Sequence, residues 1–250
     1  MQLFHYQSNS GKHTYTLLAE GRYTANCLTY ARFIPSGSRL YAVISATDGH
    51  IATWDLTEIL SPSFAVSDGK VKMGFLFQEN SPAALAWEHQ YAVHQSSVKA
   101  LAAHAISSTS TLLVTGGDDN ALSISILATP SASAPESDLV FITKCLPHAH
   151  ASAINDVTVF QESRHADRAE FIIGSSGNDQ RAKIWLVQFS TSTQVGSAAD
   201  IKVSLKKDAY TAVADLSSMG VYNPEPHEGT TMQKLVLCGV GMDMWDVNLC

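Results

Sequence analysis

The sequence predicts an all-β protein assembled from several copies of one structural unit. Two observations carry this prediction. Short apolar runs of the length of a β-strand follow one another along the chain, separated by turns rich in Gly, Asn, Asp and Ser. In addition, one combination of polar and aromatic residues recurs at long intervals, as expected for a repeat protein. The 250 residues are 45% hydrophobic and 16% charged, so the chain has enough apolar side chains to form a sizeable core.

The stretch from Phe171 to Val187 shows the unit most clearly. An apolar strand leads into a tight Gly-Asn-Asp-Gln turn, and a second apolar strand follows that contains Trp185. His150 stands upstream, at the start of another apolar stretch, while Ser175 lies in the first strand and Asp179 in the turn. We expect these four side chains to form a hydrogen-bonded chain within one sheet, with the carboxylate orienting the imidazole.

The same combination recurs in the rest of the chain, although with losses. Three turn acids each precede a Trp or its substitute by six residues, in the pairs Asp48 and Trp54, Asp119 and Ser125, and Asp179 and Trp185. The strand hydroxyls come three or four residues before these acids, at Ser45, Thr115 and Ser175. His94 opens the second unit as His150 opens the third. The first unit has no clear His, and the fourth keeps only Trp245, followed by Asp246.

The spacing divides the chain into four units, with the end of a preceding unit at its start. We expect the units to span residues 20–93, 94–147, 148–208 and 209–250, with residues 1–19 as the remnant of the preceding one. A combination that returns in every unit is expected to have a structural role, because an active site is needed only once. We therefore predict a protein that is not an enzyme and that needs no cofactor or metal.

An enzymatic interpretation has weaker support in the sequence. The candidates for a metal cluster are His148, His150, His165 and Asp167, and those for a general acid are Asp215 and Glu225. However, the sequence contains no metal-binding spacing such as HExxH, and loops collect polar residues without any catalytic need. The net charge of −7 is unfavourable for an autonomous nucleic-acid-binding protein.

The cysteines point to a reducing compartment. The four residues, Cys27, Cys145, Cys238 and Cys250, are far apart and form no CxxC pair, so the sequence does not predict a zinc site. The longest apolar runs are far shorter than a membrane span. We therefore expect a cytoplasmic location.

The recurring combination of His, Ser or Thr, Asp and Trp resembles the structural tetrad of the WD40 repeat family. That family folds as a β-propeller whose blades are four-stranded antiparallel sheets. The resemblance places the tetrad at His150, Ser175, Asp179 and Trp185, with partial versions at the corresponding residues of the other units. It implies about four degenerate blades, and we expect the C-terminal half of a larger propeller. Closure of four blades on themselves, with residues 13–19 as the missing strand, is the alternative.

Six segments carry a narrower resemblance: HQSSVKAL, VTGGDDNALSISIL, HASAINDV, GNDQRAKIWLV, TAVADLSSMGVY and VLCGVGMDMWDV. Together they resemble the WD-repeat adaptor family that partners the 2′-O-ribose methyltransferase of the tRNA wobble nucleotide. The resemblance implies a non-catalytic scaffold that binds an FtsJ-like methyltransferase and positions tRNA, while the catalytic partner would bind S-adenosylmethionine. A generic WD40 interaction scaffold in another multiprotein complex is the alternative.

Overall fold

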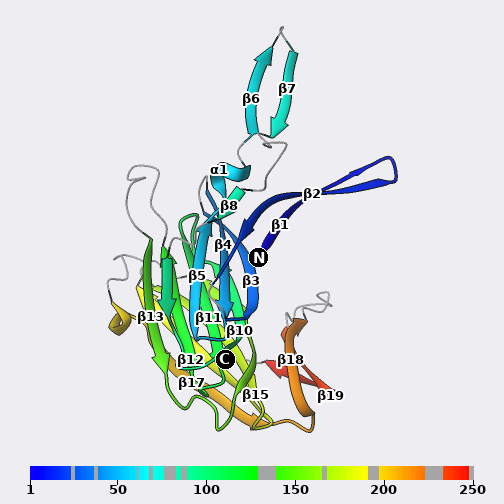
Figure 1. The fold of residues 1–250 in the computed structure, drawn as a ribbon. Coiled ribbons are helices and arrows are strands. Elements are labelled where there is room, and N and C mark those ends of the chain that lie inside the picture. Colours follow the sequence, from blue (N-terminus) through cyan, green and yellow to red (C-terminus); the bar gives the residue numbers. More distant parts are fainter. Residues whose placement is uncertain are drawn as a thin grey trace, which may run out of the picture.

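Antiparallel sheets follow one another along the chain in the computed structural model of this protein (Figure 1). The structure describes residues 1–23, 26–36, 39–60, 62–67, 70–75, 83–85, 89–128, 139–164, 168–190, 197–222 and 233–247. The first four-stranded sheet contains β3 (Leu28–Ser36), β4 (Arg39–Ala46), β5 (His50–Asp55) and β9 (His89–Ala92). The second contains β10 (Val98–Ala105), β11 (Ser110–Gly117), β12 (Leu122–Ala128) and β13 (Val140–Leu146). The third contains β14 (Ile154–Arg164), β15 (Arg168–Gly177), β16 (Arg181–Ser190) and β17 (Lys202–Tyr210).

Smaller sheets stand at the two ends of this series. A two-stranded sheet of β18 (Ala214–Tyr222) and β19 (Gln233–Val247) follows the third sheet. At the other end, β1 (Gln2–Asn9) and β2 (Lys12–Gly21) form a hairpin, and β2 also pairs with β8 (Ala83–Leu85). A separate hairpin contains β6 (Pro62–Ser67) and β7 (Lys70–Phe75). The short helical turns are α1 (Thr57–Leu60) and η1 (Ala198–Asp200).

Each four-stranded sheet has the same strand order in space as in the sequence, and its first strand lies innermost. The strands β3, β10, β14 and β18 contact one another in series, which arranges the sheets as an open arc around these inner strands (Figure 1). The predicted all-β class, with repeated four-stranded antiparallel sheets, is confirmed. The unit boundaries at residues 20, 94, 148 and 209 remain our proposal for the repeat.

Strands in the middle of the arc are apolar at consecutive positions because both of their faces are covered. In β11, Leu112, Leu113 and Val114 are all fully buried. Leu112 and Val114 pack with apolar residues of the third sheet, whereas Leu113 packs with those of the first. The core is therefore a series of apolar layers between neighbouring sheets.

Backbone hydrogen bonds also connect each unit to the next. The residue after each turn acid has a left-handed backbone, with φ of 84° at Gly49, 64° at Asn120 and 57° at Gln180. The carbonyl oxygens of these residues accept the amides of His94, His150 and Thr211 at 3.0, 3.2 and 3.0 Å, respectively. Each of the three donors lies just before the inner strand of the next sheet. The turn of one sheet therefore fixes the start of its neighbour.

Candidate functional site

The third sheet brings its four predicted residues into one hydrogen-bonded chain. The Nδ1 atom of His150 lies 3.0 Å from Oδ1 of Asp179, and its Nε2 atom lies 2.8 Å from Oγ of Ser175. The indole Nε1 of Trp185 donates to the same Oγ at 2.8 Å. Because a carboxylate only accepts, His150 donates from Nδ1 and its Nε2 accepts the Ser175 hydroxyl proton.

This arrangement is unsuited to nucleophilic catalysis. A catalytic serine needs an oxygen that a substrate can reach, but Ser175 is 0% exposed and its oxygen already accepts the Trp185 N–H. The carboxylate of Asp179 also accepts the backbone amides of Ala151 and Arg181, at 2.9 and 3.1 Å. These contacts order the turn of its own sheet. On this geometry, a structural role remains our prediction for the four residues.

Burial and hydrogen bonding shift the pKa of both titratable members of this chain. Burial lowers the pKa of His150 below 6.5, and the hydrogen bond to Asp179 offsets only part of that effect. Burial alone would raise the pKa of Asp179, but hydrogen bonds from His150 and from the amide of Ala151 hold it below 3.8. At neutral pH the pair is therefore a neutral imidazole beside a carboxylate.

The lowered pKa of His150 predicts that the protein loses stability in mild acid. Below pH 6.5 the unfolded chain binds a proton at this ring that the folded chain does not bind, which favours unfolding. We expect the melting temperature to fall between about pH 7 and about pH 5, and again below about pH 4, where Asp179 is protonated in the unfolded chain first. Melting curves at a series of pH values measure the trend. An NMR titration that gave the His150 ring a pKa above 6.5 would contradict the prediction.

The second sheet keeps three of the four members. The Nδ1 atom of His94 lies 2.9 Å from Oδ1 of Asp119, and its Nε2 atom lies 2.9 Å from Oγ1 of Thr115. Ser125 occupies the position of the tryptophan, but its hydroxyl pairs with that of Thr143 on β13, at 2.7 Å. The hydrogen-bonded chain of this unit therefore ends at Thr115.

In the first unit, a tyrosine stands where the sequence shows no histidine. The hydroxyl of Tyr23 donates to Oδ2 of Asp48 at 2.9 Å, and Nδ2 of Asn26 donates to the same oxygen at 3.1 Å. Burial and the hydrogen bond to Asp48 raise the pKa of Tyr23 to about 12, so the phenol remains a donor at neutral pH. Comparison by residue type missed Tyr23. The signal that could have found it is its place shortly before the first inner strand.

The structure does not bring Ser45 to Trp54. Ser45 precedes its turn acid by three residues, whereas Ser175 precedes its own by four. Because successive residues of a strand point to opposite faces, this difference places Ser45 on the other face, where its hydroxyl pairs with that of Thr29 at 2.8 Å. Ile44 occupies the place of the hydroxyl residue, and the buried Nε1 of Trp54 has no hydrogen-bond partner among the described residues. The expected Ser45–Trp54 hydrogen bond is therefore absent from this part of the structure.

In the fourth unit, Trp245 contacts an acid in its own strand. Its Nε1 donates to Oδ2 of Asp243 at 2.8 Å, and the hydroxyl of Thr211 donates to the same oxygen at 3.0 Å. These hydrogen bonds lower the pKa of Asp243. Thr211 opens this unit as histidines open the two units before it. Thr211 stands in the place of the histidine, and Asp243 stands in the place of the strand hydroxyl. Because both differ in type from the residue they replace, the sequence pattern did not reveal them.

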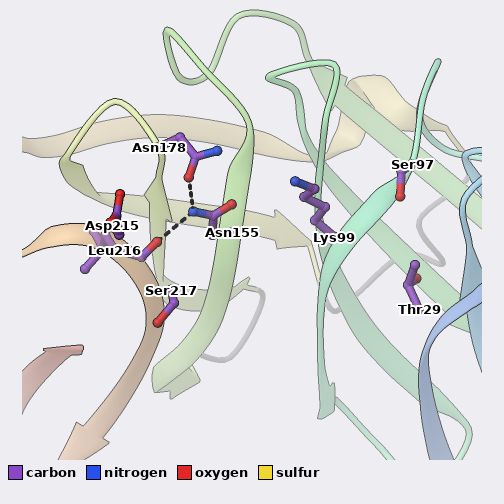
Figure 2. A pocket seen from close by; sticks show the side chains of 8 residues that line it. All are labelled: Thr29, Ser97, Lys99, Asn155, Asn178, Asp215, Leu216 and Ser217. Carbon is purple, nitrogen blue, oxygen red and sulfur yellow. Dashed lines mark hydrogen bonds between the residues drawn. The ribbon is translucent and has the colours of Figure 1, made fainter. Parts of the chain in front are cut away.

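An open pocket of about 530 Å³ lies where the inner strands begin (Figure 2). The residues that line it are Thr29, Ser97, Lys99, Asn155, Asn178, Asp215, Leu216 and Ser217. Four of them, Thr29, Lys99, Asn155 and Asp215, are each the second residue of an inner strand, β3, β10, β14 or β18. Successive residues of a strand point to opposite faces. The residues before Lys99 and Asn155 are fully buried, so Lys99 and Asn155 point away from the core.

Most residues that line this pocket have polar side chains, and these differ from unit to unit. Lys99 forms an ion pair with Asp118, with its Nζ 2.9 Å from Oδ1. Asn155 donates from Nδ2 to the carbonyl oxygen of Leu216 at 2.6 Å and also to Oδ1 of Asn178 (Figure 2). Asp215 has a left-handed backbone, with φ of 48°. The opening thus offers an ammonium group, an amide and a carboxylate to a partner.

The other candidates from the sequence lie apart from this pocket or outside the described residues. His148 lines a second pocket together with His94 and Cys145, while His165, Asp167 and Glu225 lie outside the described residues. Within the residues that the structure describes, no group of three or more His, Cys, Asp and Glu side chains could hold a metal ion. None of the helices in the described segments has the length and apolar character needed to cross a membrane.

Comparisons with known proteins find a similarity to a known repeat in a segment that includes part of the second unit. The family model for the WD domain, G-beta repeat, matches residues 87–124, a segment that includes His94, Thr115 and Asp119. Among solved structures, a chain in the crystal structure of the mitotic checkpoint complex is similar over 98% of this chain and 72% of its own length. Its sequence identity is 12% and its TM-score is 0.39, a likeness too distant to bear on function. No curated protein matches the sequence.

The matched segment is similar to the WD40 repeat, and the fold is of the β-propeller class that the sequence predicts. Propeller blades are four-stranded antiparallel sheets arranged around a central axis, as the three complete sheets are here. WD40 repeats generally form scaffolds that bind other proteins and do not catalyse reactions. The match is consistent with a role in protein interaction.

Proposed function

We propose that this chain is a non-catalytic scaffold that binds a protein partner at the pocket formed by its inner strands. The observation that carries the proposal is a contrast between two sets of equivalent positions. At the turns, the units use the same kind of hydrogen bond to connect with the next unit. At the second residue of each inner strand, they present Thr29, Lys99, Asn155 and Asp215, which differ in charge and in size.

The hydrogen bonds at the turns recur because every unit must be connected to the next. The residues around the pocket differ from unit to unit, so together they form a pattern that a specific partner can recognise. Figure 2 shows Lys99 and Asp215 on either side of Asn155. A cation and an acid on one rim favour a partner with complementary charges, because such patterns determine specificity and association rate. Sites for small molecules usually enclose most of the ligand's surface. This pocket is wide open, so it is better suited to side chains or backbone groups of a protein.

The proposal extends to the identity of the partner. The support is the sequence resemblance to the adaptor of the tRNA wobble 2′-O-ribose methyltransferase, which includes the segment VLCGVGMDMWDV on β19. The partner would be the FtsJ-like methyltransferase, and the net charge of −7 favours tRNA contact through the complex over contact with this chain alone. A cytoplasmic location is part of the proposal, and the free thiols of Cys27, Cys145 and Cys238 are compatible with it.

Variants at the rim test the pocket. Asp215→Asn and Lys99→Ala should each weaken binding of the purified methyltransferase about tenfold or more, because each removes a charge that the pocket presents to the partner. Asparagine tolerates the left-handed backbone of residue 215, so that variant keeps its local structure. Asp246→Asn and Lys202→Ala are matched controls, since both residues are exposed and lie outside the pocket. Unchanged binding by both rim variants, measured by titration calorimetry, would contradict this location.

The identity of the partner needs a separate experiment. Affinity purification of the tagged full chain should recover a 2′-O-methyltransferase, and deletion of the chain should abolish ribose methylation at the tRNA wobble position. A stable complex that contains no methyltransferase, together with unchanged tRNA methylation, would instead favour a generic WD40 scaffold.

A further inference from the structure

Each inner strand has a β-bulge at the opening of the pocket. In β3, β10 and β14, one extra residue interrupts the pairing with the second strand of the sheet, and these residues are Thr29, Lys99 and Asn155. In β18 the interruption is larger, because residues 215–217 lie opposite Gly239 alone. Bulges redirect side chains and are common beside functional sites. The fourth unit therefore departs furthest from a regular strand where it lines the pocket.

The large bulge of β18 is held by the inner strand of the third sheet. Asn155 donates from Nδ2 to the carbonyl oxygen of Leu216 at 2.6 Å. Asp156, the next residue of β14, accepts the backbone amide of Met219 at 2.6 Å. The side chain of Leu216 is fully buried and packs in the apolar layer between the third and fourth sheets. These contacts fix residues 215–217 relative to β14.

The bulge also lies directly against its own partner strand, β19. A Cβ atom on Gly239 would lie 2.5 Å from the carbonyl oxygen of Ala214 and 2.6 Å from that of Asp215. The hydroxyl of Ser217 donates to the carbonyl oxygen of Cys238 at 3.3 Å. Two neighbouring strands therefore determine where the backbone of Asp215 lies.

The carboxylate of Asp215 has no partner within the part of the chain that the structure describes. Asp215 is exposed and lines the pocket, and none of the described residues forms an ion pair or hydrogen bond with its side chain. Its left-handed backbone does not require an acid, because Asn120 and Gln180 adopt the same conformation without a charge. The local backbone therefore does not account for the negative charge at this position.

The groups beside Asp215 also accept hydrogen bonds. The Nδ2 group of Asn155 donates two hydrogen bonds within the protein, so its Oδ1 atom remains to accept others (Figure 2). The hydroxyl of Ser217 donates within the protein and can accept in addition. Lys99, which lies on the other side of Asn155, is paired with Asp118. The Asp215 side of the pocket therefore offers a negative charge and neutral acceptors.

We propose that the bulge at residues 215–217 receives an arginine side chain of the protein partner. This inference rests on the proposed function, which assigns the pocket to a protein partner. A guanidinium group has a positive charge and five N–H donors in one plane, so it can donate to a carboxylate and to neutral acceptors at the same time. The ammonium group of lysine is a compact point charge and is less suited to such a set. The partner is therefore a protein segment that presents an exposed arginine.

An NMR titration of the purified full chain with N-acetyl-arginine methylamide tests this proposal. We expect saturable shifts of the backbone amide signals of residues 215–217 and of the Asn155 side-chain amide. The citrulline analogue, which has nearly the same shape but no charge, should bind at least about threefold more weakly. Asp215→Asn should weaken arginine binding by a similar factor, since asparagine tolerates the left-handed backbone. Asp246→Asn, at an exposed position outside the pocket, should leave arginine binding unchanged.

The inference and the proposed function fail on different results. The inference would be overturned by the absence of saturable shifts at residues 215–217, by equal affinities for the arginine and citrulline analogues, or by an unchanged arginine affinity in Asp215→Asn. The proposed function would survive each of these if Asp215→Asn still weakened binding of the methyltransferase. Conversely, arginine binding at the bulge together with methyltransferase binding that is insensitive to both rim variants would overturn the proposed function alone.

Discussion

Replacing Gly49 with alanine should destabilise the protein by about 3 kcal/mol or more, the largest effect expected of any single substitution considered. A Cβ atom at this position would lie 2.2 Å from the carbonyl oxygen of His94, which is a backbone atom and cannot move aside. The backbone of Gly49 is also left-handed, with φ of 84°. The clash falls on the hydrogen bond that connects the first sheet to the second. Chemical denaturation of the variant and the unaltered chain measures the change.

Two other glycines separate the clash from the backbone effect. Gly11 has a similar φ of 81° but no atom within 4 Å of an added Cβ, and Gly220 has neither a positive φ nor a close neighbour. We expect Gly220→Ala to be almost neutral and Gly11→Ala to have a small effect, of about 1 kcal/mol. The next two turns carry Asn120 and Gln180 at the position of Gly49, so the left-handed backbone alone tolerates a side chain there. If Gly49→Ala were no worse than Gly11→Ala, the close approach to His94 would be disproved.

Replacing Asp179 with alanine should reduce the free energy of unfolding by about 1–3 kcal/mol. The substitution removes the acceptor for His150 Nδ1 and for the amides of Ala151 and Arg181. His150 is 2% exposed, so water cannot fully replace the lost partner. Thermal melting and urea titration give the difference.

Graded variants make this second prediction specific. Asp179→Asn keeps one oxygen for His150 but cannot accept both backbone amides in addition, so it should fall between the alanine variant and the unaltered chain. Asp246→Ala serves as the control, because its ion pair with Lys234 is half exposed and contributes at most about 1 kcal/mol. An Asp179→Ala variant with an unchanged melting temperature would remove the basis for a structural tetrad.

Residue type and spacing predicted the parts of the fold that repeat without change. The all-β class followed from the alternation of apolar runs and turns, and the contacts among His150, Ser175, Asp179 and Trp185 follow the expected pattern. These residues could be anticipated because a buried imidazole, hydroxyl, carboxylate and indole can satisfy one another.

Positions where a different residue serves the same purpose could not be predicted in this way. Tyr23 and Thr211 both donate to an acid at a turn or strand of their unit, but neither is a histidine. Ser45 has the expected type, yet an offset of one residue turns it to the opposite face from Trp54. Strand register decides these cases, and register is visible only when the sheets are assembled.

The pocket could not be predicted from the sequence for a related reason. Thr29, Lys99, Asn155 and Asp215 are unlike one another and lie far apart in the chain. Only their common place, as the second residue of an inner strand, brings them to one opening. A search for recurring residues therefore does not detect a site whose residues differ from unit to unit.

The backbone hydrogen bond from each turn to the next unit has an evolutionary consequence. The turn between the second and third strands cannot change length without displacing the neighbouring sheet. The connection between the third and fourth strands is free of that constraint: it is much longer in the first sheet, at residues 56–88, than in the second and third, at residues 129–139 and 191–201. The first of these contains the inserted hairpin of β6 and β7. New sequence can therefore be acquired at these connections, and with it new binding elements, while the spacing of the sheets around the inner strands stays constant.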